Sequence, residues 1–296
     1  MANRRLVLDD EHAHGGRRYY RRRARVGLKP TDGYRGLRDT PAVRGRNGHD
    51  RGNRILRAIS RLEPEAFAAL NDRLRSVAVD RGTVLAAADE APSRVYFIDT
   101  GTASVISETA SGDSLEVGCV GAEGVSHVGW LLGGTPQPYS FVAQLPLTAR
   151  EVDARDLKRL LMRDGVHPLH CLIQMYGQFV IAQLAQSTIC ARFHTAAERL
   201  ARWLLLTGSD TSADVLPLTH EAVSQMVGAP RSQVTDAVGK LRRAGCITSA
   251  RGVIEILDAQ KLRRHACECY EVERARRHAF ERRLMLKPNG TKPKPV

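Results

Sequence analysis

Apolar residues recur at helical spacing through most of the chain, but one central stretch has a different rhythm. From Ile55 to Val77 the positions three and four apart are apolar, which predicts two short helices divided near Pro64. Short β-branched and aromatic runs separated by glycine-containing turns then continue from Val95 to about Val152, through the segment GWLLGG. Short strands at this spacing predict a small antiparallel barrel or sandwich.

Helical spacing returns after this β-rich region. ARDLKRLLMRD predicts a short helix, and HTAAERLARWLLL at residues 194–206 predicts another. Between them lies a longer apolar stripe with heptad-like spacing: Leu169, Leu172, Ile173, Tyr176, Phe179, Val180 and Leu184. A helix of this length favours burial of the stripe against a partner helix from a second subunit. Packing within one chain is the alternative.

The segment Leu218 to Ile247 predicts two short helices joined by a tight turn. Thr219 stands where a side chain caps a helix N-terminus, and Gly228 can adopt the left-handed conformation that ends a helix. Pro230 suits the first turn of the following helix. Four residues of that helix at positions i, i+3, i+4 and i+7 are expected to pack inward: Val234, Ala237, Val238 and Leu241.

The opposite face of this second helix carries polar side chains of mixed type: Arg231, Ser232, Gln233, Thr235, Asp236 and Lys240. A merely solvated face would carry mostly Glu and Lys. Arg can pair bidentately with guanine and Gln with adenine, while Ser and Thr reach bases or phosphate. The face therefore predicts a DNA-reading helix with Arg231, Ser232, Gln233, Thr235 and Asp236 at the bases. Phosphate contacts are expected from Thr219, Lys240, Arg242, Arg243 and Arg251, since RRAGCITSARGVIEIL predicts a two-stranded wing.

The order of these elements resembles the Crp/Fnr family of transcriptional regulators, from about Ile55 to Tyr270. LTHEAVSQMVGAPRSQVTDAVGKLRRAG is similar to the DNA-binding signature of that family, and Ser232 stands where many members carry Glu. The resemblance implies an α+β chain with an N-terminal antiparallel β-barrel (a double-stranded β-helix), a long dimerisation helix and a C-terminal winged helix-turn-helix. It also implies a homodimer on palindromic double-stranded DNA, acting with RNA polymerase.

The resemblance and the basic composition of the two ends together predict five parts: a basic, disordered extension over residues 1–54, a sensor barrel with flanking helices over 55–165, a dimerisation helix over 166–190, a winged helix-turn-helix over 191–270 and a basic tail over 271–296. The net charge is +13, and residues 1–54 carry 15 of the 45 Lys and Arg but only 6 of the 32 Asp and Glu. Net charge alone therefore does not establish nucleic-acid binding. No apolar run of about 18 residues occurs in the sequence, which argues against a membrane span. The first residues include Arg and Asp in place of an apolar segment, so we expect no secretion. The six scattered cysteines favour reduced thiols in the cytoplasm.

The sensor region raises the question of an effector. Crp-like members hold a cyclic nucleotide with a Gly-Glu pair and an Arg on the phosphate, and Glu123 with His127 marks the corresponding pocket here. From Val95 through Ala149, however, the sequence contains no Lys and no Arg. A buried phosphodiester needs a cation or several donors, so we expect no cyclic nucleotide, although a cyclic-nucleotide-responsive regulator stays the main alternative.

The Cys and His residues bear on metal binding and on enzymatic chemistry. No Cys precedes Cys119, so iron–sulfur ligands near the N-terminus are lacking, and we expect no cofactor. Cys267 and Cys269 form a CxC pair, which chelates poorly alone and favours small buried apolar residues. His167 and His170 flank Pro168 and leave a haem or metal ligand as an alternative to a structural role. A cupin-like metal enzyme needs several histidines on neighbouring strands, whereas the β-rich region has only His127. We therefore expect this protein to have no enzymatic activity.

Overall fold

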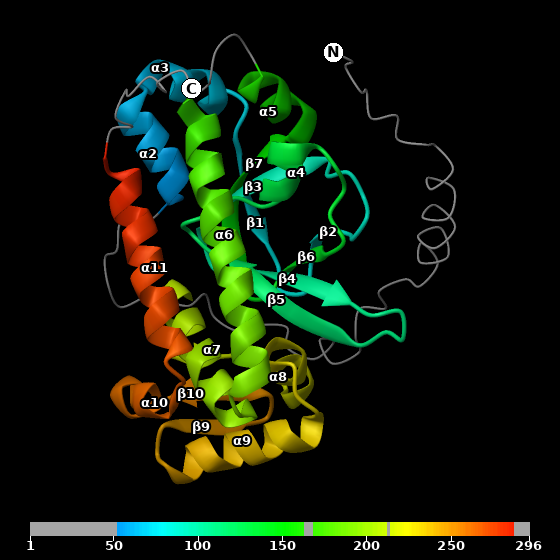
Figure 1. The fold of residues 1–296 in the computed structure, drawn as a ribbon, viewed down its shortest axis with the longest axis vertical. Helices are drawn as coiled ribbons and strands as arrows, with labels where there is room; N and C mark the ends of the chain where they lie inside the picture. The colour runs from blue at the N-terminus through cyan, green and yellow to red at the C-terminus, as the bar shows by residue number, and fades with distance from the viewer. Residues whose placement is uncertain (1–51, 163–167, 212–213, 287–296) are drawn as a thin grey trace, which may run out of the picture. The chain divides into compact units, whose positions relative to one another are not determined.

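The computed structural model describes residues 52–162, 168–211 and 214–286 (Figure 1). The basic extension predicted over residues 1–54 lies outside these ranges up to residue 51, and so do His167 and residues 287–296. No helix within the described ranges is long and apolar enough to cross a membrane.

The central β-region folds into two antiparallel sheets in a jelly-roll-like arrangement, which confirms the predicted double-stranded β-helix, although the sheets do not close into a continuous barrel. The sheets have the strand orders β1-β7-β3 and β2-β6-β4-β5. Val95 and Phe97 of β3 share one core cluster with Phe141 of β6 and Leu147 of β7. The strands are β1 (Arg75–Val79), β2 (Val84–Ala86), β3 (Arg94–Thr100), β4 (Ala103–Glu108), β5 (Ser114–Val120), β6 (Ser140–Ala143) and β7 (Leu147–Asp153).

Two short helices precede the sheets, as predicted. Helices α2 (Arg54–Leu62) and α3 (Pro64–Asn71) meet at Pro64. The buried Asn53 caps α2, because its side-chain oxygen accepts a hydrogen bond from the Leu56 N–H (3.1 Å). Its amide donates to the carbonyl oxygens of Ile98 (3.0 Å) and Gly124 (2.6 Å), and these bonds attach the start of α2 to the sheet domain.

The segment GWLLGG is helical, and its expected place in the run of strands is wrong. It forms helix α4 (Val128–Gly133), which ends at Gly134 in the left-handed conformation with φ 77°. Trp130 and Leu131 are buried there. A short apolar run of this kind does not distinguish a strand from a buried helical turn. Helix α5 (Ala154–Leu161) follows β7 as predicted, and Asp153 accepts hydrogen bonds from its first turn.

Helix α6 (Pro168–Phe193) carries the predicted apolar stripe, but the stripe is covered by the same chain. Helices α6 and α11 (Cys269–Leu284) lie side by side in Figure 1 and contact each other. The ring of Phe280 in α11 stacks on Phe179 with centroids 5.2 Å apart and packs against Tyr176 at 5.8 Å. Packing within one chain is therefore the correct alternative for the five stripe residues from Leu169 to Phe179, which are buried, while Val180 and Leu184 stay half-buried.

The predicted basic tail is also corrected, because residues 271–284 belong to α11. Its buried residues recur every three or four positions: Cys269, Glu273, Arg277, Phe280 and Leu284. Glu273 accepts hydrogen bonds from Arg202 (2.7 Å) and Gln183 (3.1 Å). Because two of the inward residues are charged, the helical stripe is hidden in a sequence that looks like a solvated charge run.

The C-terminal part has the predicted winged helix-turn-helix. Its remaining elements are α7 (Ala196–Thr211), β8 (Val215–Leu216), α8 (His220–Val227), α9 (Arg231–Arg243), β9 (Ile247–Ala250), β10 (Val253–Ile256) and α10 (Ala259–His265). The three strands form an antiparallel sheet of order β8-β10-β9. Helix α9 packs on α7 and α8, which leaves its opposite side uncovered.

Candidate nucleic-acid interface

The turn between α8 and α9 has the predicted capping residues. Thr219 Oγ1 accepts a hydrogen bond from the Ala222 N–H (3.1 Å), which confirms its place as the N-cap of α8. Gly228 ends that helix with φ 58°, a conformation that strains residues with a Cβ atom. Pro230 stands at the cap of α9, one position before the first turn in which it was expected. These two residues fix the angle at which α9 leaves the turn.

The two faces of α9 differ as the periodicity predicted. Val234, Ala237, Val238 and Leu241 are buried. The polar residues opposite are all exposed: Arg231, Ser232, Gln233, Thr235, Asp236 and Lys240. The structure therefore presents the five predicted base-reading side chains on one surface at the start of the helix, where side chains of a helix-turn-helix enter the major groove.

Two of these side chains already have partners within the chain. Thr235 Oγ1 donates to the Arg231 carbonyl (3.0 Å) and lies 3.2 Å from His220 Nδ1. The guanidinium of Arg231 lies 3.9 Å from the Glu221 carboxylate, and both groups are largely exposed. An exposed ion pair of this length contributes little, so Arg231 is available to another partner at small cost.

The predicted phosphate-contacting residues border the same surface. Arg242 and Arg243 are exposed at the end of α9, and Arg251 is exposed at the tip of the β9–β10 hairpin. Arg251 and Gly252 both have positive φ, at 47° and 76°. Positive φ at both central residues is the conformation of a type I′ two-residue hairpin loop, and it places the Arg251 side chain at the end of the wing.

A hydrogen bond between Glu116 and Trp203 joins the sheet domain to the helix-turn-helix part. Trp203 Nε1 of α7 donates to Glu116 Oε1 of β5 (2.9 Å), and Ser104 donates to the second carboxylate oxygen. Both residues line a cleft of about 600 Å³ that also reaches Met226 of α8. Burial raises the pKa of Glu116 to about 7 despite these hydrogen bonds. This pair was not predictable from the sequence, because a single acidic residue in a strand looks like a solvent-facing position.

The raised pKa of Glu116 predicts a pH-dependent stability. Between about pH 4.5 and pH 7 the folded protein retains a proton that the unfolded chain releases, so the free energy of unfolding falls as the pH rises through this window. Glu116→Gln keeps an oxygen for Trp203 but cannot ionise. Between pH 5 and pH 7.5 we expect the free energy of unfolding of the wild-type protein to fall by on the order of 2 kcal/mol more than that of the variant, measured by urea unfolding. Parallel pH profiles of the two proteins would contradict this.

The two residues expected at an effector pocket are both buried. The side chain of Glu123 is 0% exposed, lies 3.8 Å from Arg54 and 3.9 Å from Arg277, and accepts a hydrogen bond from the Gly121 N–H (3.2 Å). His127 packs against the Phe141 ring and contacts Ser126 Oγ (2.7 Å). Burial lowers the pKa of His127 to about 4, so the ring is neutral at physiological pH. Neither side chain lines the cleft beside Glu116.

Two family models match the chain. Residues 198–265 match the Crp-like helix-turn-helix domain, and residues 76–164 match the cyclic nucleotide-binding domain. A search of curated proteins finds no match.

Solved structures share the fold at low sequence identity. A Crp/Fnr-family transcriptional regulator from Eubacterium rectale is 15% identical, with a TM-score of 0.58 over 70% of this chain and 95% of its own. FixK2 from Bradyrhizobium japonicum is 17% identical, with a TM-score of 0.55 over 66% of this chain and 98% of its own. The c-di-GMP-responsive regulator CLP from Xanthomonas campestris is 14% identical, with a TM-score of 0.55 over 66% of this chain and 100% of its own.

Proposed function

The chain belongs to the Crp/Fnr family of DNA-binding transcriptional regulators, and from this premise we propose that it acts as a homodimer on a two-fold symmetric operator. Two copies of α9 would enter successive major grooves about one helical turn apart. The proposal includes contact with RNA polymerase, a cytoplasmic location and no catalytic activity. The observation that carries it is the exposed polar surface at the start of α9, beside the basic wing.

The roles of the side chains follow from their chemistry. Arg231 and Gln233 are assigned to bases, because guanidinium and amide groups form bidentate pairs with guanine and adenine. Ser232 and Thr235 contribute shorter hydroxyl contacts. Asp236 is tolerated near DNA only where it accepts from cytosine N4 or pairs with an Arg. Arg242, Arg243 and Arg251 position the domain on the phosphates with Thr219 and Lys240, and contribute no sequence preference.

Dimerisation is assigned to the face of α6 that its own chain leaves exposed. Ile181 and Phe193 are 69% and 72% exposed, and Ile189 is 48% exposed. With Gln174, Gln178, Ala185 and Thr188 these residues form an exposed stripe along α6, at steps of three and four. Heptad-like spacing on an exposed, mostly uncharged face is typical of a helix that pairs with a second copy. The opposite face of α6 is already covered by α11.

A cyclic nucleotide is not part of the proposed function. The Val95–Ala149 span offers no Lys or Arg to a buried phosphate. The carboxylate of Glu123, which would mark the nucleotide pocket, lies close to two arginines of its own chain instead. Calorimetry with cyclic AMP and cyclic GMP tests this point, and micromolar binding of either would overturn it.

Substitutions at the start of α9 test the function. We expect Arg231→Ala and Gln233→Ala each to weaken binding to a DNA site selected from a random pool by about 1–3 kcal/mol, and to relax the preference at one base pair. Arg242→Ala is the matched control, since loss of a phosphate contact weakens binding to all sequences equally and reduces its salt dependence. Fluorescence anisotropy at fixed salt measures both effects. An unchanged sequence preference in both Arg231→Ala and Gln233→Ala would overturn the proposal.

A further inference from the structure

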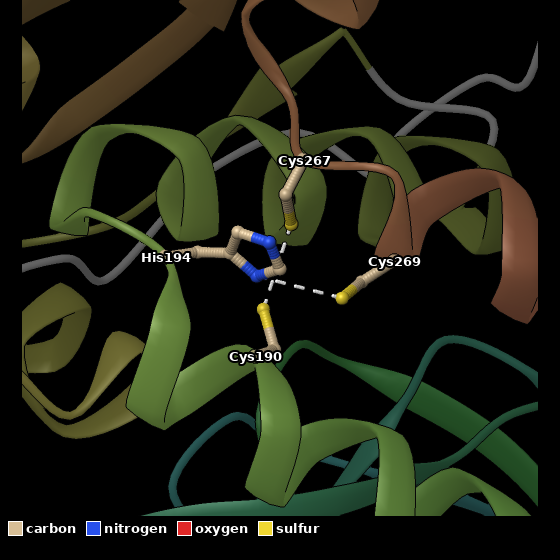
Figure 2. A group of neighbouring side chains, drawn as sticks. All are labelled: Cys190, His194, Cys267 and Cys269. Atoms are coloured by element: carbon tan, nitrogen blue, oxygen red, sulfur yellow. Dashed lines mark hydrogen bonds between the residues drawn. The ribbon is translucent and has the colours of Figure 1, made fainter.

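Four side chains with metal-binding atoms meet where α6 ends: Cys190, His194, Cys267 and Cys269 (Figure 2). Their ligand atoms all lie within 4.8 Å of one another. The sulfur atoms of Cys190 and Cys267 are 3.5 Å apart, and Cys269 Sγ lies 3.6 Å from His194 Nδ1. We propose that these residues bind one Zn²⁺ ion through three thiolates and one imidazole.

The distances match a tetrahedral ion. Zn–S bonds of about 2.3 Å and Zn–N bonds of about 2.0 Å place the ligand atoms of a tetrahedron about 3.5–3.8 Å apart. The contacts between Cys190 and Cys267 and between Cys269 and His194 have these lengths, and no pair of ligand atoms in the group is more than 4.8 Å apart. An iron–sulfur cluster would need its ligands farther apart, because iron and sulfide ions stand between them. A Cys₃His set without an open position is typical of a structural zinc site.

The orientation of His194 provides a second, independent indication. Its Nδ1 faces the sulfur atoms, while its Nε2 donates a hydrogen bond to the carboxylate of Glu268 (3.1 Å). A histidine that binds a metal usually donates its other ring N–H to a carboxylate, which fixes the tautomer and raises the basicity of the coordinating nitrogen. Gln186 Nε2 also approaches Cys269 Sγ (3.0 Å), as a donor to a thiolate would.

The surroundings suit a thiolate-rich ion. The three cysteines are buried and form a small cluster separate from the main core. Three thiolates with Zn²⁺ leave one net negative charge, which needs compensation in a buried place. Arg199 of α7 interacts electrostatically with Cys190 and Cys267 and supplies the opposite charge. Arg202 also interacts with both cysteines, although its guanidinium is hydrogen-bonded to Glu273.

The site joins the two ends of the DNA-binding part. Cys190 and His194 occupy the last turn of α6 and the residue after it, whereas Cys267 and Cys269 lie between α10 and the first turn of α11. The segment from 195 to 266 contains the complete winged helix-turn-helix. An ion bound here closes this segment into a loop and fixes α6 to α11, which stabilises the folded protein as a cross-link does.

This inference replaces the expectation that Cys267 and Cys269 serve only as small buried apolar residues. A CxC pair offers two ligands, and two ligands make a weak site. The other two come from residues more than 70 positions earlier, with the i, i+4 spacing that places both on one side of a helical turn. Among the described residues, His170 belongs to no such group.

Metal analysis of the tag-free, full-length protein, purified in a reducing buffer without chelator, tests the site. We expect one zinc per chain. After removal of zinc, added Co²⁺ should give the sulfur-to-cobalt charge-transfer and visible d–d bands of a tetrahedral thiolate complex, and one equivalent of Zn²⁺ should abolish them. Chelation should lower the thermal midpoint, and zinc should restore it.

Variants identify the ligands. Cys190→Ser and Cys267→Ser should lose zinc, and His194→Ala should lose the tetrahedral cobalt spectrum, while Cys246→Ser should keep one zinc per chain. Cys246 is the matched control, because it is buried but lies outside the group. If a ligand variant does not fold, the cobalt spectrum of the wild-type protein decides, since its intensity reports the number of bound thiolates. A reduced wild-type protein that takes up neither zinc nor cobalt overturns the proposal, as does an iron–sulfur chromophore.

Discussion

Ile181→Glu is expected to separate the homodimer into folded monomers and to reduce affinity for a two-fold symmetric operator by about 10²- to 10⁴-fold. Ile181 is 69% exposed, so the substitution hardly affects the folding of one chain. In a symmetric dimer the same position faces its own copy, and two carboxylates would meet where apolar surface was buried. Each monomer still contacts one half-site, but the two helix-turn-helix domains are no longer linked in one dimer, so binding of the first no longer favours binding of the second.

Sedimentation equilibrium and fluorescence anisotropy measure the two parts of this expectation. Val84→Glu is the matched control, because Val84 is a 44% exposed apolar residue on β2, away from α6. The control should remain dimeric and bind the operator with wild-type affinity. A wild-type protein that is monomeric at micromolar concentration, or an Ile181→Glu variant that stays dimeric, contradicts the assignment of this face.

The helix-turn-helix was predictable because its determinants are local. The caps at Thr219 and Gly228 and the buried positions Val234 to Leu241 are set by residues within one or two turns of each other, and the structure has them as the periodicity predicted. The exposed surface of α9 was predictable because it consists of the residues that do not belong to this buried stripe. The same local reasoning identified the helix break at Pro64 and the hairpin at Arg251 and Gly252.

The parts that were missed depend on contacts between distant segments. Heptad-like spacing shows that one face of α6 is buried, but it does not say that Phe280, about a hundred residues later, does the covering. Glu116 has a raised pKa because it is buried where the sheet domain meets α7, although its hydrogen bond from Trp203 acts in the opposite direction. Cys190 and His194 form a four-ligand group only because the fold brings Cys267 and Cys269 next to them. Periodicity in a sequence predicts burial, but not the partner.

Phe280→Ala tests whether α11 is an integral part of the fold. The Phe280 side chain is 6% exposed and contacts the rings of Tyr176 and Phe179. Its removal leaves a cavity between α6 and α11, and truncation of a buried Phe costs about 3–5 kcal/mol. We expect a loss of this size in the free energy of urea unfolding.

The matched control on the same helix is Arg282→Ala, which removes an exposed side chain and should change the free energy of unfolding by less than about 0.5 kcal/mol. If Phe280→Ala were equally mild, α11 would be a loosely attached tail, as the charge-rich sequence first indicated. A large loss confined to Phe280→Ala means that α11 stabilises the inner face of α6. The outer face of α6 is then the one left for a second subunit. Phe280→Ala therefore tests the folding of the chain, and Ile181→Glu tests its dimerisation.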